Sequence, residues 1–141
     1  MRKIVVVMAV VITSFATAQK MQEKDVPAPV KGAIQKQYPK ATKVKWAKEG
    51  DKYEAGFDLG KEETSLLIDA SGTILETEVE IEISQLPKKI SAYIKANYSG
   101  QSIKEAAKIT DAKGSVTYEA EIKGKDLIFD SKGEFIKETK D

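Results

Sequence analysis

Four glutamates alternate with other residues in one short segment and form the densest set of candidate ligands in the sequence: Glu76, Glu78, Glu80 and Glu82. In a strand, side chains two residues apart point to the same face and lie about 6.5 to 7 Å apart. Such a row could bind a basic partner or supply oxygen ligands to Ca²⁺. It could also be an ordinary solvated face, with its charge offset by lysines such as Lys43 and Lys45 on neighbouring strands, which is the commoner arrangement.

The chain lacks the residue types that most catalytic mechanisms require. Histidine and cysteine are both absent, which excludes Ser-His-Asp and Cys-His arrangements and nearly all zinc sites. Neither of the two common glycine-rich phosphate-binding motifs, G-x-x-x-x-G-K-[ST] and G-x-G-x-x-G, is present. Pairs of carboxylates could hydrolyse a glycosidic bond, but among 22 acidic residues some pair has a suitable separation by chance. The sequence therefore predicts a protein that is not an enzyme and that has no cofactor and no metal centre.

The first eighteen residues have the order of a secretory signal peptide. A basic start, Met1-Arg2-Lys3, precedes the apolar run 4–12, and the small residues Ala16 and Ala18 flank Thr17. Signal peptidase cleaves after such a triplet, so we expect cleavage after Ala18. A membrane anchor would need about 18 to 20 apolar residues. We therefore expect a periplasmic or secreted protein with no membrane insertion after cleavage.

The charge of the exported chain argues against nucleic acid as a partner. Of the 23 basic residues, Arg2 and Lys3 lie in the signal peptide, which leaves 21 against 22 acidic residues and a net charge of −1. No arginine remains, so the protein lacks the two-pronged guanidinium hydrogen bonds with which arginine recognises bases.

The absence of cysteine means that the hydrophobic core alone must hold the fold. The chain has the length of one domain.

The sequence repeats itself with an offset of about sixty residues. Val26-Pro27 and the apolar residues after it align with Leu86-Pro87, and Tyr53-Glu54-Ala55 aligns with Tyr118-Glu119-Ala120. The segments 66–72 and 127–133 also match, each with an Asp-x-x-Gly turn. We therefore divide the chain into a signal peptide (1–18), a flexible leader (19–25), a first repeat (26–84) and a second repeat (85–141), the two repeats forming one compact domain.

Each repeat is predicted to be a helix followed by four strands. Proline favours a first helical turn, and apolar residues then recur at helical spacing up to Tyr38 and Tyr98. Period-two patterns predict strands near 43–46, 53–59, 64–69 and 75–83, and near 103–110, 116–123, 126–130 and 134–138. Short turns between these strands favour antiparallel pairing. The fold class is therefore α+β, with two tandem α-β-β-β-β units in one antiparallel sheet and the helices on one face.

The aromatic residues fit a core better than a binding site. Trp46 alternates with other apolar residues and is expected on the helix-covered face, inside the core rather than at an interface. Tyr38 and Tyr98 recur at equivalent positions, which indicates packing within each repeat. Tyr93 stands where the first repeat has Ala33, and the repeat pattern gives it no role.

These features together resemble the PepSY-like domains of exported bacterial proteins, which are related in fold to the beta-lactamase inhibitory protein. The resemblance rests on the Val-Pro and Leu-Pro helix starts, the Tyr38-Pro39 helix end, the Val44-Lys45-Trp46 and Tyr-Glu-Ala strands and the Asp-x-x-Gly turns, and it covers residues 26–138. It implies one curved sheet and an inhibitor-like or chaperone-like role. No motif transfers an inhibitory residue.

We therefore expect a non-catalytic module that binds a protein or peptide of the cell envelope on its exposed sheet face, or alternatively a cation or small ligand on the acidic strand. The candidate partner-binding residues are Lys43, Lys45, Glu76, Glu78, Glu80, Glu82, Glu119 and Glu121.

Overall fold

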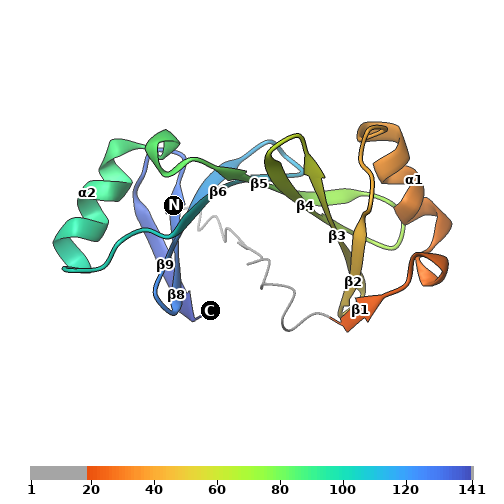
Figure 1. Cartoon of the computed structure of the whole chain (residues 1–141), viewed down its shortest axis with the longest axis horizontal. Helices are drawn as coiled ribbons and strands as arrows, with labels where there is room; N and C mark the ends of the chain where they lie inside the picture. The colour runs from red at the N-terminus through yellow and green to blue at the C-terminus, as the bar shows by residue number, and fades with distance from the viewer. Residues whose placement is uncertain (1–18, 141) are drawn as a thin grey trace, which may run out of the picture.

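The computed structural model describes residues 19–140, which form one antiparallel sheet and two α-helices (Figure 1). The nine strands follow one another in the sheet in the order of the chain, from β1 to β9. The sheet is strongly curved, and the helices α1 and α2 lie at its two ends on the convex side. The predicted fold class is confirmed. The predicted signal peptide lies outside the described residues.

The two helices have the same length and the same ends. Helix α1 spans Ala28–Gln37 and α2 spans Lys88–Asn97. Each begins directly after a proline, and in each the N–H of the tyrosine after the helix donates to the isoleucine carbonyl four residues earlier. Pro39 then prevents the first helix from continuing.

Both repeats contribute four predicted strands, and turns of two to five residues connect those that are not separated by a helix. The strands are β2 (Lys45–Glu49), β3 (Lys52–Leu59), β4 (Glu62–Ile68), β5 (Ile74–Ile81), β6 (Glu105–Asp111), β7 (Val116–Ile122), β8 (Lys125–Asp130) and β9 (Phe135–Lys140). The turns after β4, β6 and β8 each begin with an aspartate whose side chain accepts backbone N–H bonds. These bonds fix the hairpin geometry.

Residues 19–25, expected to form a flexible leader, instead form strand β1 (Gln19–Met21) and the 3-10 helix η1 (Glu23–Asp25). Strand β1 pairs with β2, with Met21 opposite Trp46. Sixty residues later, the end of β5 pairs with β6 in the same register, with Ile81 opposite Ala106, and the 3-10 helix η2 (Ile83–Gln85) follows. The repeat therefore starts one strand earlier than the sequence pattern indicated.

Each helix covers its own hydrophobic core. The first core contains Val30, Ile34, Trp46, Phe57 and Leu66, and the second contains Ile90, Ile94, Ile122, Leu127 and Phe129, together with neighbouring apolar residues. Trp46 is 5% exposed, which confirms its predicted place in the core. Strand β5 passes from one core to the other, because Ile74 packs against the first and Ile81 against the second.

Candidate binding surface on the helix-free face

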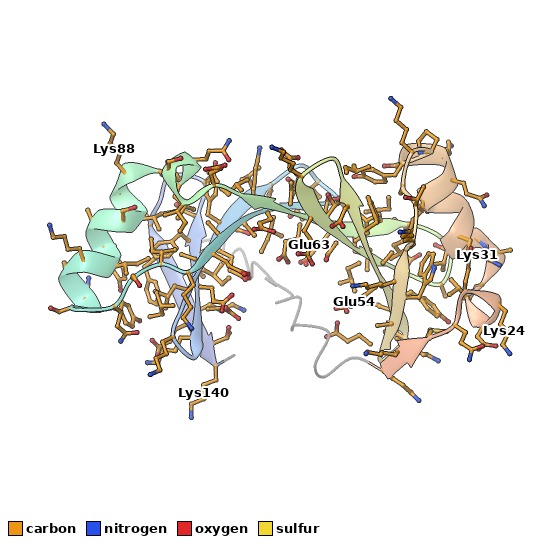
Figure 2. All side chains as sticks on the ribbon, viewed as in Figure 1. Lys24, Lys31, Glu54, Glu63, Lys88 and Lys140 are labelled. Carbon is orange, nitrogen blue, oxygen red and sulfur yellow. The ribbon has the colours of Figure 1, made fainter. Side chains whose placement is uncertain are left out.

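The sheet has one face without helices, and this helix-free face is the candidate binding surface. It carries every second residue of each strand, and the strand register shows which residues lie beside one another. Figure 2 shows Glu54 and Glu63 on the inner side of the curved sheet, whereas Lys31 and Lys88 lie outside on the helices. The ion pairs Lys89–Glu134 and Lys125–Glu138 lie on the helix-covered side.

Three of the four alternating glutamates lie together on this face. Glu76, Glu78 and Glu80 belong to β5, the middle strand of the sheet, and Glu76 is only 6% exposed. Glu82 lies beyond the end of β5, where it caps η2: its side chain accepts the Gln85 N–H and its own N–H donates to the Gln85 side chain. The structure thus gives Glu82 a capping contact and separates it from the row.

The expected lysine neighbours of these glutamates are elsewhere. Strand β5 pairs with β4 and β6, and β2, which carries Lys45, is three strands away. Lys45 lies opposite Gly56, while Lys43 precedes β2 and has a left-handed backbone with a φ of 54°. The interpretation that Lys43 and Lys45 offset the glutamates from neighbouring strands is therefore contradicted by the strand order.

Between β4 and β8 the ionisable side chains on the helix-free face are all carboxylates. Glu119 lies between Ala107 and Ile128, and Glu121 lies between Glu105 and Asp126. The register places no lysine on this face within these five strands. Lysines occur on it only nearer the edges of the described sheet. The carboxylates are Glu63, Glu76, Glu78, Glu80, Glu105, Asp111, Glu119, Glu121, Asp126 and Asp130.

Small and aliphatic residues lie among these carboxylates. Leu67 and Ile128 are 1% exposed, and Ala107 and Ile109 are 7% exposed. Apolar residues in these positions suit the aliphatic part of an amphipathic side chain, whose charged end can then reach the surrounding carboxylates.

Glu54 is a member of this surface that the sequence analysis missed as a site residue. It lies on β3 between Ala47 and Leu67 and is completely buried. Burial raises the pKa of Glu54 to about 8, and the carboxyls of Glu49 and Glu78 contribute to the rise. As an anion, Glu54 has no hydrogen-bond donor for either oxygen, but with a proton it can donate to Glu49. The repeated Tyr-Glu-Ala pattern marks its position but not its burial.

Glu78 is the second carboxyl that holds its proton unusually strongly. Burial is the main cause that raises the pKa of Glu78 to about 7, and the negative charges of Glu76, Asp126 and Glu63 contribute to this rise. These charges come from three different strands, so the effect depends on the curved sheet as a whole. Two carboxyls on this face therefore titrate near neutral pH, where ordinary glutamates are already ionised.

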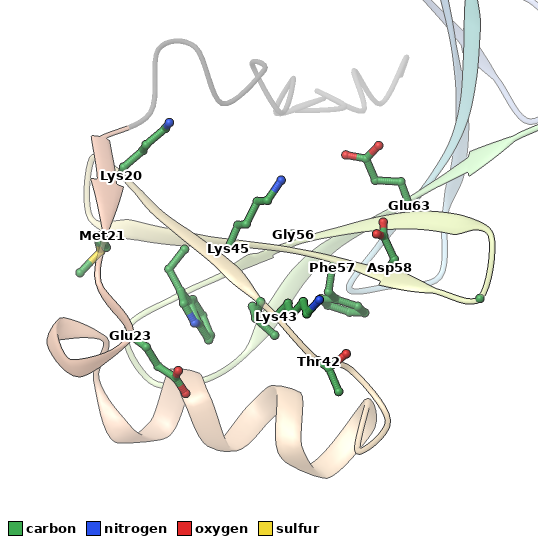
Figure 3. Close-up of a pocket in the computed structure, with 13 residues that line it drawn as sticks. Lys20, Met21, Glu23, Thr42, Lys43, Lys45, Gly56, Phe57, Asp58 and Glu63 are labelled. Atoms are coloured by element: carbon green, nitrogen blue, oxygen red, sulfur yellow. The ribbon is translucent and has the colours of Figure 1, made fainter.

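A groove of about 1020 Å³ lies at the β1 end of the sheet (Figure 3). Its lining includes Lys20, Lys45, Gly56, Asp58 and Glu63. Figure 3 shows Lys20, Lys45 and Glu63 extending on the same side of the sheet around Gly56. The groove also reaches Trp46, whose Nε1 has no hydrogen-bond acceptor within residues 19–140. The groove therefore connects the sheet edge with the acidic surface.

Metal binding gains no support from this geometry. Within residues 19–140, no three acidic residues converge in a way that could hold a metal ion. The carboxylates are spread over several strands rather than gathered in one loop.

None of the helices within residues 19–140 is long and apolar enough to cross a membrane.

Comparison with protein families identifies the class of this protein. The model of the PepSY-like family, described as beta-lactamase-inhibitor-like, matches the chain twice, over residues 14–76 and 51–137. The two matches overlap over residues 51–76 and together span residues 14–137, most of the sequence. The chain belongs to this family. Among curated proteins no match was found.

Solved structures from Bacteroides share the fold. A DUF2874 family protein from Bacteroides uniformis has a TM-score of 0.72 and 21% identity, covering 81% of this chain and 88% of its own. A protein from Bacteroides eggerthii, which its name assigns to the periplasm, has a TM-score of 0.74 and 15% identity over 82% and 88%. A BLIP-like protein from Bacteroides fragilis has a TM-score of 0.65 and 25% identity over 81% and 86%.

Proposed function

We propose that this protein is an exported, non-catalytic module that holds a protein or peptide partner on its helix-free face. The observation that carries the proposal is the uninterrupted acidic surface from β4 to β8, with apolar residues between its carboxylates. An ordinary solvated sheet face carries both signs of charge on neighbouring strands, whereas β4 to β8 carry only acidic ionisable residues on this face. A partner of opposite charge would complement this surface.

The family supports a binding role in the envelope rather than a reaction. Its description is inhibitor-like, and structural relatives are periplasmic by name. The chain has no histidine or cysteine, and its helix-free face is acidic, which disfavours nucleic acid. A β-lactamase is one candidate partner, but no residue of this surface selects it above other proteins.

Charge reversal on one face tests this role. The purified protein and the variant Glu80→Lys/Glu119→Lys are compared as bait in periplasmic extract, with bound proteins identified by mass spectrometry. The variant Asp51→Lys/Glu62→Lys carries the same change of charge at exposed positions away from the helix-free face and is the matched control. We expect a partner that the first variant loses and the control keeps. A partner retained equally by both variants would contradict the proposal.

Export is tested separately by fractionating cells and determining the amino terminus of the protein. We propose a periplasmic location and cleavage after Ala18, so that the exported chain begins at Gln19, the first residue of β1. A cytoplasmic protein that retains residues 1–18 would contradict this part of the proposal.

A further inference from the structure

The acidic surface has one position where its carboxylates surround very small residues. On neighbouring strands β3, β4 and β5, the residues Gly56, Ser65 and Glu78 lie in one row across the sheet. The row on one side carries Glu54, Leu67 and Glu76, and the row on the other side carries Asp58, Glu63 and Glu80. Gly56 has no side chain, and the groove described above extends to it. We call this position the Gly56 subsite.

We propose that the Gly56 subsite takes the cationic end of a lysine or arginine side chain of a basic partner segment and that binding expels a proton from the surface. This inference rests on the proposed function and specifies the chemistry of its partner. A buried carboxylate without a donor is costly, whereas one that meets an ammonium or guanidinium group is satisfied.

Burial supports the subsite independently of the number of acidic residues. Glu54 is completely buried, and as an anion it has no hydrogen-bond donor for either oxygen among the described residues. The carboxyl of Glu78 also has one oxygen without a donor there. These are the atoms that a bound cation would satisfy.

The charges that face Glu54 and Glu78 come from several strands. Glu49 of β2 adjoins Glu54, while Glu63 of β4, Glu76 of β5 and Asp126 of β8 act on Glu78. The cations on this side are Lys20 and Lys45, which line the groove, and Lys52 of β3, which lies opposite Glu49. Lys45 lies across Gly56 from this acidic group and would compete with an incoming cation.

Proton release follows from the two elevated pKa values. Without a ligand, Glu54 and Glu78 hold protons at pH 6, since their pKa values are about 8 and about 7. A bound cation favours the ionised carboxyls, so a proton leaves as the cation binds. Because lysine keeps its charge throughout this range, binding strengthens with rising pH.

The test uses pentalysine as the probe and the full purified protein. Isothermal titration at pH 5.5, 7 and 8, in two buffers with different ionisation enthalpies, measures both affinity and released protons. We expect affinity at least about tenfold higher at pH 8 than at pH 5.5, the change that one released proton produces over about one pH unit. Affinity should fall with added salt, and pentaglutamate should not bind.

Two variants locate the effect. Glu54→Gln/Glu78→Gln keeps the shape of both side chains and should abolish proton release and flatten the pH dependence of binding. Glu62→Gln, on the other face, is the control and should behave like the original protein. Lys45→Gln should tighten binding, because the competing cation is removed. Thermal unfolding of each variant verifies that it is folded.

The outcomes separate the inference from the proposed function. If pentalysine binds without releasing protons, or binds equally well to Glu54→Gln/Glu78→Gln, the Gly56 subsite is overturned although the surface can still hold a partner. If pentalysine fails to bind while an envelope protein depends on Glu80 and Glu119, the partner chemistry is overturned and the proposed function stands. Calcium ions that displace pentalysine and release the same proton would assign the subsite to a metal and overturn the inference.

Discussion

The two halves of the molecule have the same strand register but fill their cores differently. Where the first half has Trp46 on β2 and the small Ala33 on α1, the second has Ala106 on β6 and Tyr93 on α2. Tyr93 stacks on Phe135 at a centroid distance of 4.9 Å and meets the edge of Phe129 at 5.6 Å. The large aromatic ring has thus moved from the strand to the helix, which keeps the filled volume similar, as a close-packed core requires.

Removing the Trp46 side chain should change the stability of the protein more than any other substitution in this comparison. We expect Trp46→Ala to lower the free energy of unfolding by about 3 to 5 kcal/mol, because it leaves a large cavity in the first core. Adding Ala33→Tyr should restore part of the loss, since the second half carries its large ring on the helix and a small residue on the strand. Denaturant unfolding of both variants measures this. Additive losses, without any recovery, would show that the exchange of bulk between helix and strand is not compensatory.

The glycines of the equivalent hairpin turns should also differ. Gly72 and Gly133 both have positive φ, 91° and 88°, but a Cβ on Gly72 would lie 2.5 Å from the backbone oxygen of Pro29. At Gly133 the nearest atom would be the Lys89 Cβ at 3.1 Å. We expect Gly72→Ala to cost about 2 to 4 kcal/mol and Gly133→Ala about 1 to 2 kcal/mol, the latter mainly from the left-handed backbone. Equal losses of stability would contradict this difference between the helix contacts.

Glu54 of the first half provides a pH-dependent test. Because the pKa of Glu54 is raised to about 8 in the folded protein, its contribution to stability is complete below about pH 4.5 and is lost as the pH rises through 8. Glu54→Gln should therefore raise the free energy of unfolding at pH 8 by about 1 to 3 kcal/mol and change it much less at pH 5. Thermal unfolding at both pH values measures this, with the exposed Glu80→Gln as control. A uniform effect at both pH values would contradict the assigned titration.

The tyrosines after the two helices should give the smallest difference. The Tyr98 hydroxyl donates to Glu138 at 2.5 Å, and this bond raises the pKa of Tyr98 to about 12. Tyr38 has no such carboxylate partner within residues 19–140 and instead packs on Phe57 at 5.1 Å. Ultraviolet titration should therefore show one tyrosine that ionises only near pH 12 and that Tyr98→Phe removes. Loss of that step in Tyr38→Phe would reverse the assignment.

Local patterns were enough to predict most of the fold. The prolines before the helices, the period-two alternation and the Asp-x-x-Gly turns identify both helices and eight of the nine described strands, because these features act through neighbouring residues. Strand β1 was missed because Gln19-Lys20-Met21 has no apolar alternation. Its formation depends on pairing with β2, which is a contact between distant residues.

The sequence by itself determined that Glu76, Glu78 and Glu80 share a face, since alternation in a strand follows from backbone geometry alone. Only the tertiary structure decided what surrounds them. The strand order separates them from Lys45 and places Glu119 and Glu121 on the same surface, and the curvature of the sheet brings Asp126 of β8 close enough to act on Glu78. The burial of Glu54 likewise depends on residues distant in the chain, so the proton-binding character of this surface exists only in the folded protein.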